Sequence, residues 1–84
     1  MNIDHLVTMA NQIGRFFASY PDPEEGRLEI ANHLQRYWAP SMRRQLFQHI
    51  DTHSGEGLHA LVLQALVEHR REHMAPPPAG GDAG

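Results

Sequence analysis

The sequence predicts an all-α fold, a small bundle of three to four short helices, and three observations support this prediction. Apolar residues recur at steps of three and four in successive segments, which is the spacing of amphipathic helices. Residues that start and stop helices lie at the ends of those segments, and no segment shows strand alternation. After Met74 the sequence APPPAGGDAG has no residue able to anchor a core. We therefore expect a single helical domain at residues 1–74 and a disordered Pro/Gly-rich C-terminal tail at residues 75–84.

The first predicted helix spans residues 3–17. Its inward face is expected to carry Ile3, Leu6, Val7, Ala10, Ile13 and Phe17. A second apolar strip of Met9, Ile13, Phe16 and Tyr20 is rotated away from this face, and one neighbouring helix could not cover both. Phe16 and Phe17 point in different directions, so we expect Phe17 inside. Phe16, with Met9 and Tyr20, forms either an exposed patch for a partner or a surface that the other helices wrap.

A second helix is predicted to follow Asp22, which can cap it, with Pro23 at its first position. Its buried face is expected to comprise Leu28, Ala31, Leu34 and Trp38, with Ile30 and Tyr37 beside it. The pattern stops at Ala39-Pro40. Tyr37 and Trp38 carry large rings with polar groups that can close a core or anchor a partner, and we expect one of them to be buried internally.

A third helix is predicted to begin at Pro40. Its inward face is expected to carry Met42, Leu46 and Ile50, with Phe47 flanking them. It ends in the turn-rich stretch at residues 51–57, after which a fourth helix is predicted. Its inward residues repeat at helical spacing as far as a polar end at residues 68–73: Leu58, Leu61, Val62, Ala65, Leu66 and His69.

The composition excludes several classes of function. The 84 residues include no Cys, which rules out disulfides, thiolate zinc sites and iron–sulfur ligation, so any redox cofactor must lie on another chain. The formal net charge is -3, so no nucleic-acid partner is expected. No apolar run could span a membrane and the N-terminus lacks the features of a secretory signal, which predicts a cytoplasmic protein with no membrane partner. A domain this small hides only roughly 60% of the surface of its unfolded chain, which favours a partner that completes its stability.

One segment matches a catalytic pattern. His69, Glu72 and His73 fit the H-x-x-E-H arrangement, in which two His hold zinc and Glu acts as a base. Such a site also needs a third ligand and a cleft, whereas these residues precede only the Pro/Gly tail. We interpret the segment as a solvated polar helix end, and a small zinc hydrolase is the alternative. His49, His53 and His59 could bind zinc or nickel adventitiously.

Arginine and aromatic residues form the candidate contact surface. Arg43 and Arg44 lie in the first turn of a helix, where the dipole disfavours cations. They either contact a carboxylate or phosphate on another molecule or form an ordinary solvated pair, and Arg15 and Arg36 have the same two interpretations. No catalytic, cofactor-binding or metal residue is predicted. The predicted partner-binding residues are Met9, Arg15, Phe16, Tyr20, Arg36, Tyr37, Trp38, Arg43 and Arg44.

Several segments, taken together in their order along the chain, resemble a known family. They are MANQIGRFF at residues 9–17 with Tyr20-Pro21, IANHL at residues 30–34 with Trp38-Ala39-Pro40, and MRRQL at residues 42–46. This sequence resembles the delta subunit of bacterial NAD-dependent, molybdenum-containing formate dehydrogenase over roughly residues 3–67. The resemblance implies a cytoplasmic complex in which a large subunit with a molybdenum-pterin cofactor and iron–sulfur clusters oxidises formate. Further iron–sulfur clusters and FMN then pass the electrons to NAD.

The resemblance implies that this chain carries none of those cofactors and has no active site of its own. Our main hypothesis is an accessory subunit that binds the catalytic alpha subunit and, through it, the beta and gamma subunits, and that is needed for assembly or activity. The alternative is a transient maturation factor that helps load the molybdenum cofactor, with Arg43 and Arg44 near its phosphate groups. The third hypothesis is the small zinc hydrolase that uses His69, Glu72 and His73.

Overall fold

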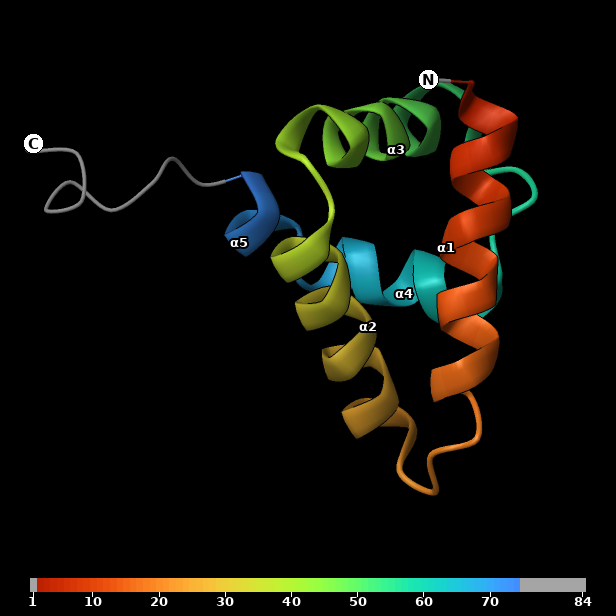
Figure 1. Cartoon of the computed structure of the whole chain (residues 1–84), viewed down its shortest axis with the longest axis vertical. Helices are drawn as coiled ribbons and strands as arrows, with labels where there is room; N and C mark the ends of the chain where they lie inside the picture. Colours follow the sequence, from red (N-terminus) through yellow and green to blue (C-terminus); the bar gives the residue numbers. More distant parts are fainter. Residues whose placement is uncertain (1, 75–84) are drawn as a thin grey trace, which may run out of the picture.

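The computed structural model describes residues 2–74, which form five helices and no strand (Figure 1). The helices are α1 (Ile3–Phe17), α2 (Pro23–Tyr37), α3 (Pro40–His53), α4 (Ala60–Glu68) and α5 (Arg70–Met74). The predicted all-α fold class is confirmed, and the first three helices begin at the predicted residues. The predicted tail at residues 75–84 lies outside the described residues.

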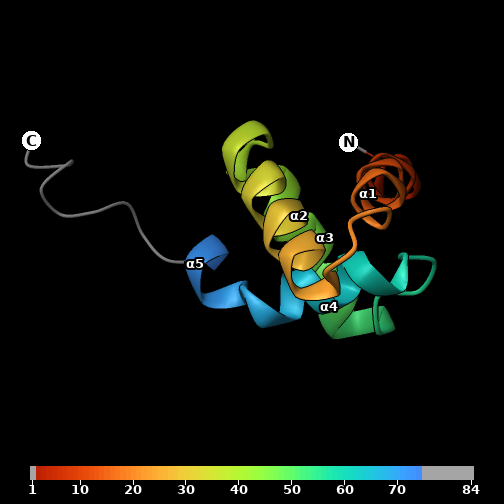
Figure 2. The same cartoon turned by 90° about the horizontal axis from the view of Figure 1, so that it is seen from below.

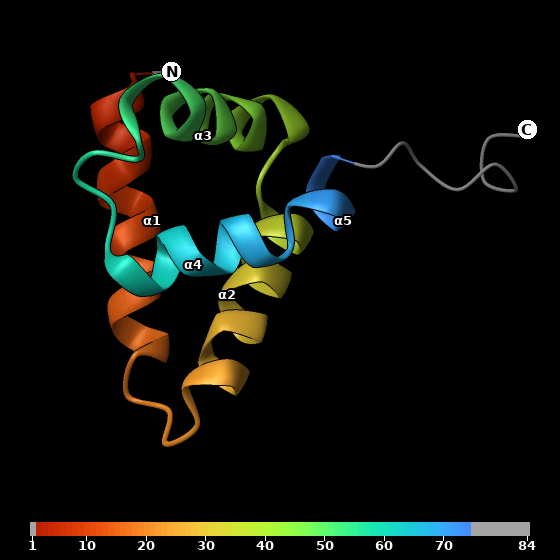
Figure 3. The same cartoon turned by 180° about the vertical axis from the view of Figure 1, so that it is seen from behind.

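The first two helices form a hairpin that the later helices brace. The chain runs down α1 and back along α2, and α3 crosses the open end of the hairpin (Figure 1). Helix α4 crosses one face of the hairpin, and the view from behind shows it passing over both α1 and α2 (Figure 3). The view from below shows α4 on one side of the α1 and α2 pair (Figure 2). The opposite face of the hairpin is not covered by any helix that the structure describes.

Local capping fixes the helix ends. The Asn2 side chain accepts a hydrogen bond from the backbone N–H of Asp4 at 2.7 Å, and Asp22 accepts one from the N–H of Glu24 at 3.0 Å. Both satisfy N–H groups that the first helical turn leaves unpaired. Helix α3 ends at His53, and the next residue, Ser54, has a left-handed φ of 57° that terminates the helix.

The core lies where α1, α2, α3 and α4 meet. Its fully or nearly buried members are Leu6, Ala10, Ile30, Leu34, Trp38, Leu46, Phe47, Val62, Ala65 and Leu66. Two predictions of the buried face were wrong. Leu28 is 43% exposed while Ile30 is fully buried, because the arc of α2 enclosed by α1 and α4 does not extend to residue 28. Phe47 is a central core residue and does not merely flank the inward face of α3.

Helices α1 and α4 approach closely at Gly14. A Cβ atom at this position would lie 2.5 Å from Cγ2 of Val62, so only glycine allows the observed packing. Beside this crossing, the Asn11 side chain accepts from the backbone N–H of His59 at 2.7 Å and donates to the carbonyl of Gly57 at 2.9 Å. These contacts fix α4 across one face of the hairpin.

The fourth predicted helix is divided in two. Helix α4 ends at Glu68, and His69 adopts φ -110° and ψ 21°, outside the helical range, before α5 begins at Arg70. Its start is also two residues later than the apolar pattern indicated, because the Nδ1 atom of His59 accepts from the N–H of Leu61 and caps the helix. No helix among the described residues is long and apolar enough to cross a membrane.

Candidate partner-binding groove

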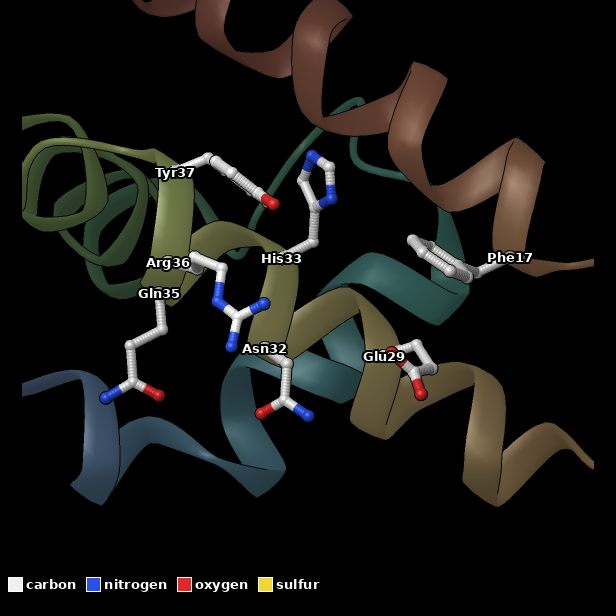
Figure 4. Close-up of a pocket in the computed structure, with 7 residues that line it drawn as sticks. All are labelled: Phe17, Glu29, Asn32, His33, Gln35, Arg36 and Tyr37. Carbon is white, nitrogen blue, oxygen red and sulfur yellow. The ribbon is translucent and has the colours of Figure 1, made fainter.

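A groove lies along the exposed face of α2, on the side of the hairpin away from α4, and reaches α1 at Phe17. Its larger part has a volume of about 690 Å³ and is lined by Phe17, Glu29, Asn32, His33, Gln35, Arg36 and Tyr37 (Figure 4). It continues past Phe17 and His33 to a smaller hollow that Gln12, Ile13 and Phe16 also line. Helical spacing places Glu29 on the opposite side of α2 from Arg27, whose Nε atom lies 3.0 Å from Glu68 of α4.

Four rings follow one another in this groove, Phe16, Phe17, His33 and Tyr37, and Tyr20 contacts Phe17 from the side; we call these five rings the aromatic ladder. The ring centroid of Phe17 lies 4.9 Å from that of Phe16 and 6.1 Å from that of His33. The ring centroids of His33 and Tyr37 are 4.8 Å apart. Figure 4 shows Phe17, His33 and Tyr37 along the side of α2 that faces α1. Phe16 and Tyr37 are each 66% exposed, so the ladder presents apolar area to solvent at both ends.

Charged and amide side chains form the outer rim of the groove on α2. Glu29 and Arg36 are seven residues apart, so they lie on the same face of the helix, about 10 Å apart along its axis. Within residues 2–74, neither side chain takes part in an ion pair. The rim therefore presents an available carboxylate and an available guanidinium on either side of Asn32 and His33.

The structure brings only part of the predicted contact set to this groove. Phe16, Tyr20, Arg36 and Tyr37 belong to the groove or its ladder. Met9 is half-buried against the core, Arg15 is exposed on α1, and Arg44 lines a separate hollow on α3.

Two predicted contact residues have internal roles. Trp38 is only 7% exposed, so it closes the core and offers no surface to a partner, which confirms that one of the two adjacent rings is buried. Arg43 Nη1 donates to the backbone carbonyl of Trp38 at 2.6 Å and to that of Gln35 at 3.2 Å. The guanidinium thus satisfies carbonyl groups at the C-terminal end of α2, where a cation is also favoured by the helix dipole. The unfavourable position of Arg43 in the first turn of α3 is therefore compensated by its contact with the C-terminal end of α2.

Sequence reasoning missed His33 and placed Phe17 only in the core. The signal for His33 was present, because Glu29, His33 and Tyr37 recur at steps of four and define one row on α2. Its significance depends on α1, which brings Phe17 against this row, and no sequence pattern specifies that packing.

The family comparison agrees with the resemblance noted in the sequence. The family model described as NADH-dependant formate dehydrogenase delta subunit FdsD matches residues 5–66, well over half of the chain. The chain belongs to this delta subunit family. No curated protein and no solved structure matches it.

The region of this delta subunit that matches the family model includes the whole aromatic ladder and ends before the break at His69. Helix α5 and the His69 to His73 segment therefore lie beyond the matching region. Their structure differs from the predicted solvated helix end. His73 is 7% exposed and packs its ring against Phe47, with centroids 5.8 Å apart.

The geometry of this segment does not suit a zinc site. His73 Nε2 lies 3.0 Å from the carbonyl oxygen of Ala31, which can only accept, so Nε2 carries the proton and is not free to bind a metal. Burial lowers the pKa of His73, and the hydrogen bond to Ala31 opposes this shift. His69 instead faces two carboxylates, with Glu72 at 3.4 Å and Glu68 at 3.6 Å.

The other histidines do not assemble into a ligand set. His49 and His53 are neighbours on α3, with ring centroids 5.6 Å apart, but His49 Nε2 lies 2.7 Å from the carbonyl of Glu56. The Nδ1 atom of His59 is occupied in capping α4. Among the described residues no group of three or more His, Asp or Glu side chains could hold a metal ion.

Proposed function

We propose that this chain is a non-catalytic accessory subunit that binds the large, molybdenum-pterin-containing alpha subunit of a cytoplasmic NAD-dependent formate dehydrogenase. Through the alpha subunit it associates with the beta and gamma subunits, and it is needed for assembly or activity of the complex. The molybdenum-pterin cofactor, iron–sulfur clusters, FMN and NAD belong to those partners. The family match supports the complex, and the aromatic groove supports the mode of association.

The exposed rings of the groove are the observation that carries this proposal. Phe16 and Tyr37 hold large apolar surfaces in contact with water, although the core residues of the same domain are almost completely buried. Burying such surface is favourable, and aromatic residues are enriched in the centres of protein interfaces. The Arg36 and Glu29 side chains at the rim provide the polar border that such interfaces have.

Co-expression with the catalytic subunits tests the proposal. The full chain would carry an affinity tag, and the co-purifying protein, its molybdenum content and formate-dependent NAD reduction would be measured. Stoichiometric recovery of active enzyme is the expected result. Recovery of only a cofactor-poor alpha subunit would instead identify the transient maturation factor. If no formate dehydrogenase subunit is recovered under conditions where the enzyme is made, the proposal is wrong.

The alternative function, a transient maturation factor, is less well supported once the positions of Arg43 and Arg44 are considered. It relied on Arg43 and Arg44 as neighbours of the cofactor phosphates, but Arg43 is bound to the end of α2. Of the two arginines only Arg44 is exposed, and it lies beside Ser41 of α3 and Arg70 of α5. We therefore retain this function only as the second outcome of the co-expression experiment.

A further inference from the structure

We infer that the free chain forms a two-fold homodimer in which α2 of one copy lies antiparallel along the α1 and α2 groove of the other. The inference concerns the isolated chain and does not depend on the proposed function. It follows from the charge arrangement on α2, from the exposed rings beside it, and from the absence of any other described element on this face.

The charges at the groove rim are self-complementary. Two antiparallel copies of α2, related by a two-fold axis between Asn32 and His33, would place Glu29 of each copy opposite Arg36 of the other. Both pairs form at once because the two residues are equally distant from the axis. An isologous interface of this kind requires a patch that complements itself, and opposite charges set its register.

The rings beside these charges supply the apolar part of the interface. His33 and Tyr37 lie on the side of α2 that faces α1, next to the charged residues. Phe16 and Phe17 continue the apolar surface onto α1. A two-fold axis perpendicular to both copies of α2 gathers the ladders of the two copies on one side of the helix pair. When two helices pack side by side, the ridges formed by the side chains of one helix fit into the grooves of the other.

Two other occupants are less complementary. The segment at residues 75–84 contains one acidic residue and no basic residue, so it offers no cation for Glu29, although proline runs can bind aromatic grooves. The second is an extended peptide that binds by adding a strand; this mode requires a free sheet edge, and residues 2–74 form no strand. A second copy supplies a cation, an anion and aromatic rings at matching positions.

Sedimentation velocity on the full chain, over a range of concentrations up to about 1 mM, tests the dimer. We expect a concentration-dependent shift from monomer to dimer for the natural sequence. Arg36→Glu places two carboxylates opposite each other and should raise the dimer Kd on the order of tenfold or more, and Glu29→Arg should do the same with two cations. The double variant E29R/R36E restores both pairs in reverse and should recover dimerisation.

Matched controls separate the pairing from net charge and from folding. Arg44→Glu changes the net charge as Arg36→Glu does, but lies on α3, and should leave the dimer Kd unchanged. Circular dichroism would confirm that every variant is helical. A chain that stays monomeric throughout the range overturns the inference. So does a folded double variant that fails to recover, or an Arg44→Glu variant that is weakened as much as Arg36→Glu.

The dimer and the proposed function can fail separately. Sedimentation uses the chain alone, whereas the co-expression experiment measures recovery of the catalytic subunit. If both hold, they use the same groove, so the catalytic subunit must displace the second copy. The homodimer would then cover the exposed rings of the free chain until its partner is present.

Discussion

The imidazole Nε2 of His73 donates a hydrogen bond to the backbone carbonyl of Ala31 at 3.0 Å, and this contact joins α5 to the middle of α2. It leaves Nδ1 buried without a hydrogen-bond partner among the described residues. A proton on Nδ1 would therefore introduce a charge that no acceptor compensates. Burial is the main cause that lowers the pKa of His73; the hydrogen bond to Ala31 opposes it, Arg43 and His69 lower the pKa further, and Glu72 raises it.

The first prediction is that His73 makes stability depend on pH. Because its folded pKa lies below the ordinary value of 6.5, the unfolded chain binds more protons between these two pKa values. The contribution of His73 is thus complete above about pH 6.5 and declines as the pH falls toward the folded pKa. We would measure the free energy of unfolding in urea at about pH 7.5 and at about pH 5.5. Lowering the pH should reduce this free energy more for the natural chain than for His73→Gln. Equal losses would contradict the prediction.

The second prediction concerns the close approach at Gly14. Gly14→Ala would force its new methyl group against Val62, and overpacking of this kind costs about 1–3 kcal/mol, partly offset by the better helix propensity of Ala. Val62→Ala removes the obstructing methyl group but leaves a cavity. The double variant G14A/V62A should therefore lose less unfolding free energy than the sum of the two single losses. Strict additivity would show that the two sites do not compete for space.

The third prediction separates two adjacent arginines. Arg43→Met removes two hydrogen bonds to the end of α2, and charge-assisted bonds of this kind make the expected loss about 1–3 kcal/mol. Arg44→Met alters an exposed side chain and should change stability by no more than about 0.5 kcal/mol. Chemical denaturation of the two variants provides the comparison. A similar loss in both would indicate a general charge effect and not the contact with α2.

These cases show what the sequence could and could not predict. The ends of α1, α2 and α3 follow from local signals such as Asp22, Pro23 and Pro40, because capping and proline geometry act within one turn. The break at His69 and the burial of His73 have no comparable local signal, since they depend on where α5 meets Ala31 and Phe47.

The candidate site was predictable to a similar extent. The exposure of Phe16 follows from its position beside the inward Phe17, which is a property of one helix. The role of Arg43 required the end of α2 to be placed beside the start of α3, and the groove required two helices to be set side by side. Local sequence reasoning therefore identifies the exposed ring, but not the groove to which it belongs.

The fourth prediction tests the groove as the surface that binds the catalytic subunit. Phe16→Ala and Tyr37→Ala should each weaken binding by about 2 kcal/mol, roughly thirtyfold in Kd, as expected for large aromatic side chains that an interface buries. Both side chains are 66% exposed, so thermal unfolding should change little. Val67→Ala on α4, which is 57% exposed and away from the groove, is the matched control. Titration of labelled chain with purified alpha subunit would measure each Kd. Weakening by Val67→Ala equal to that by the groove variants would place the binding surface elsewhere.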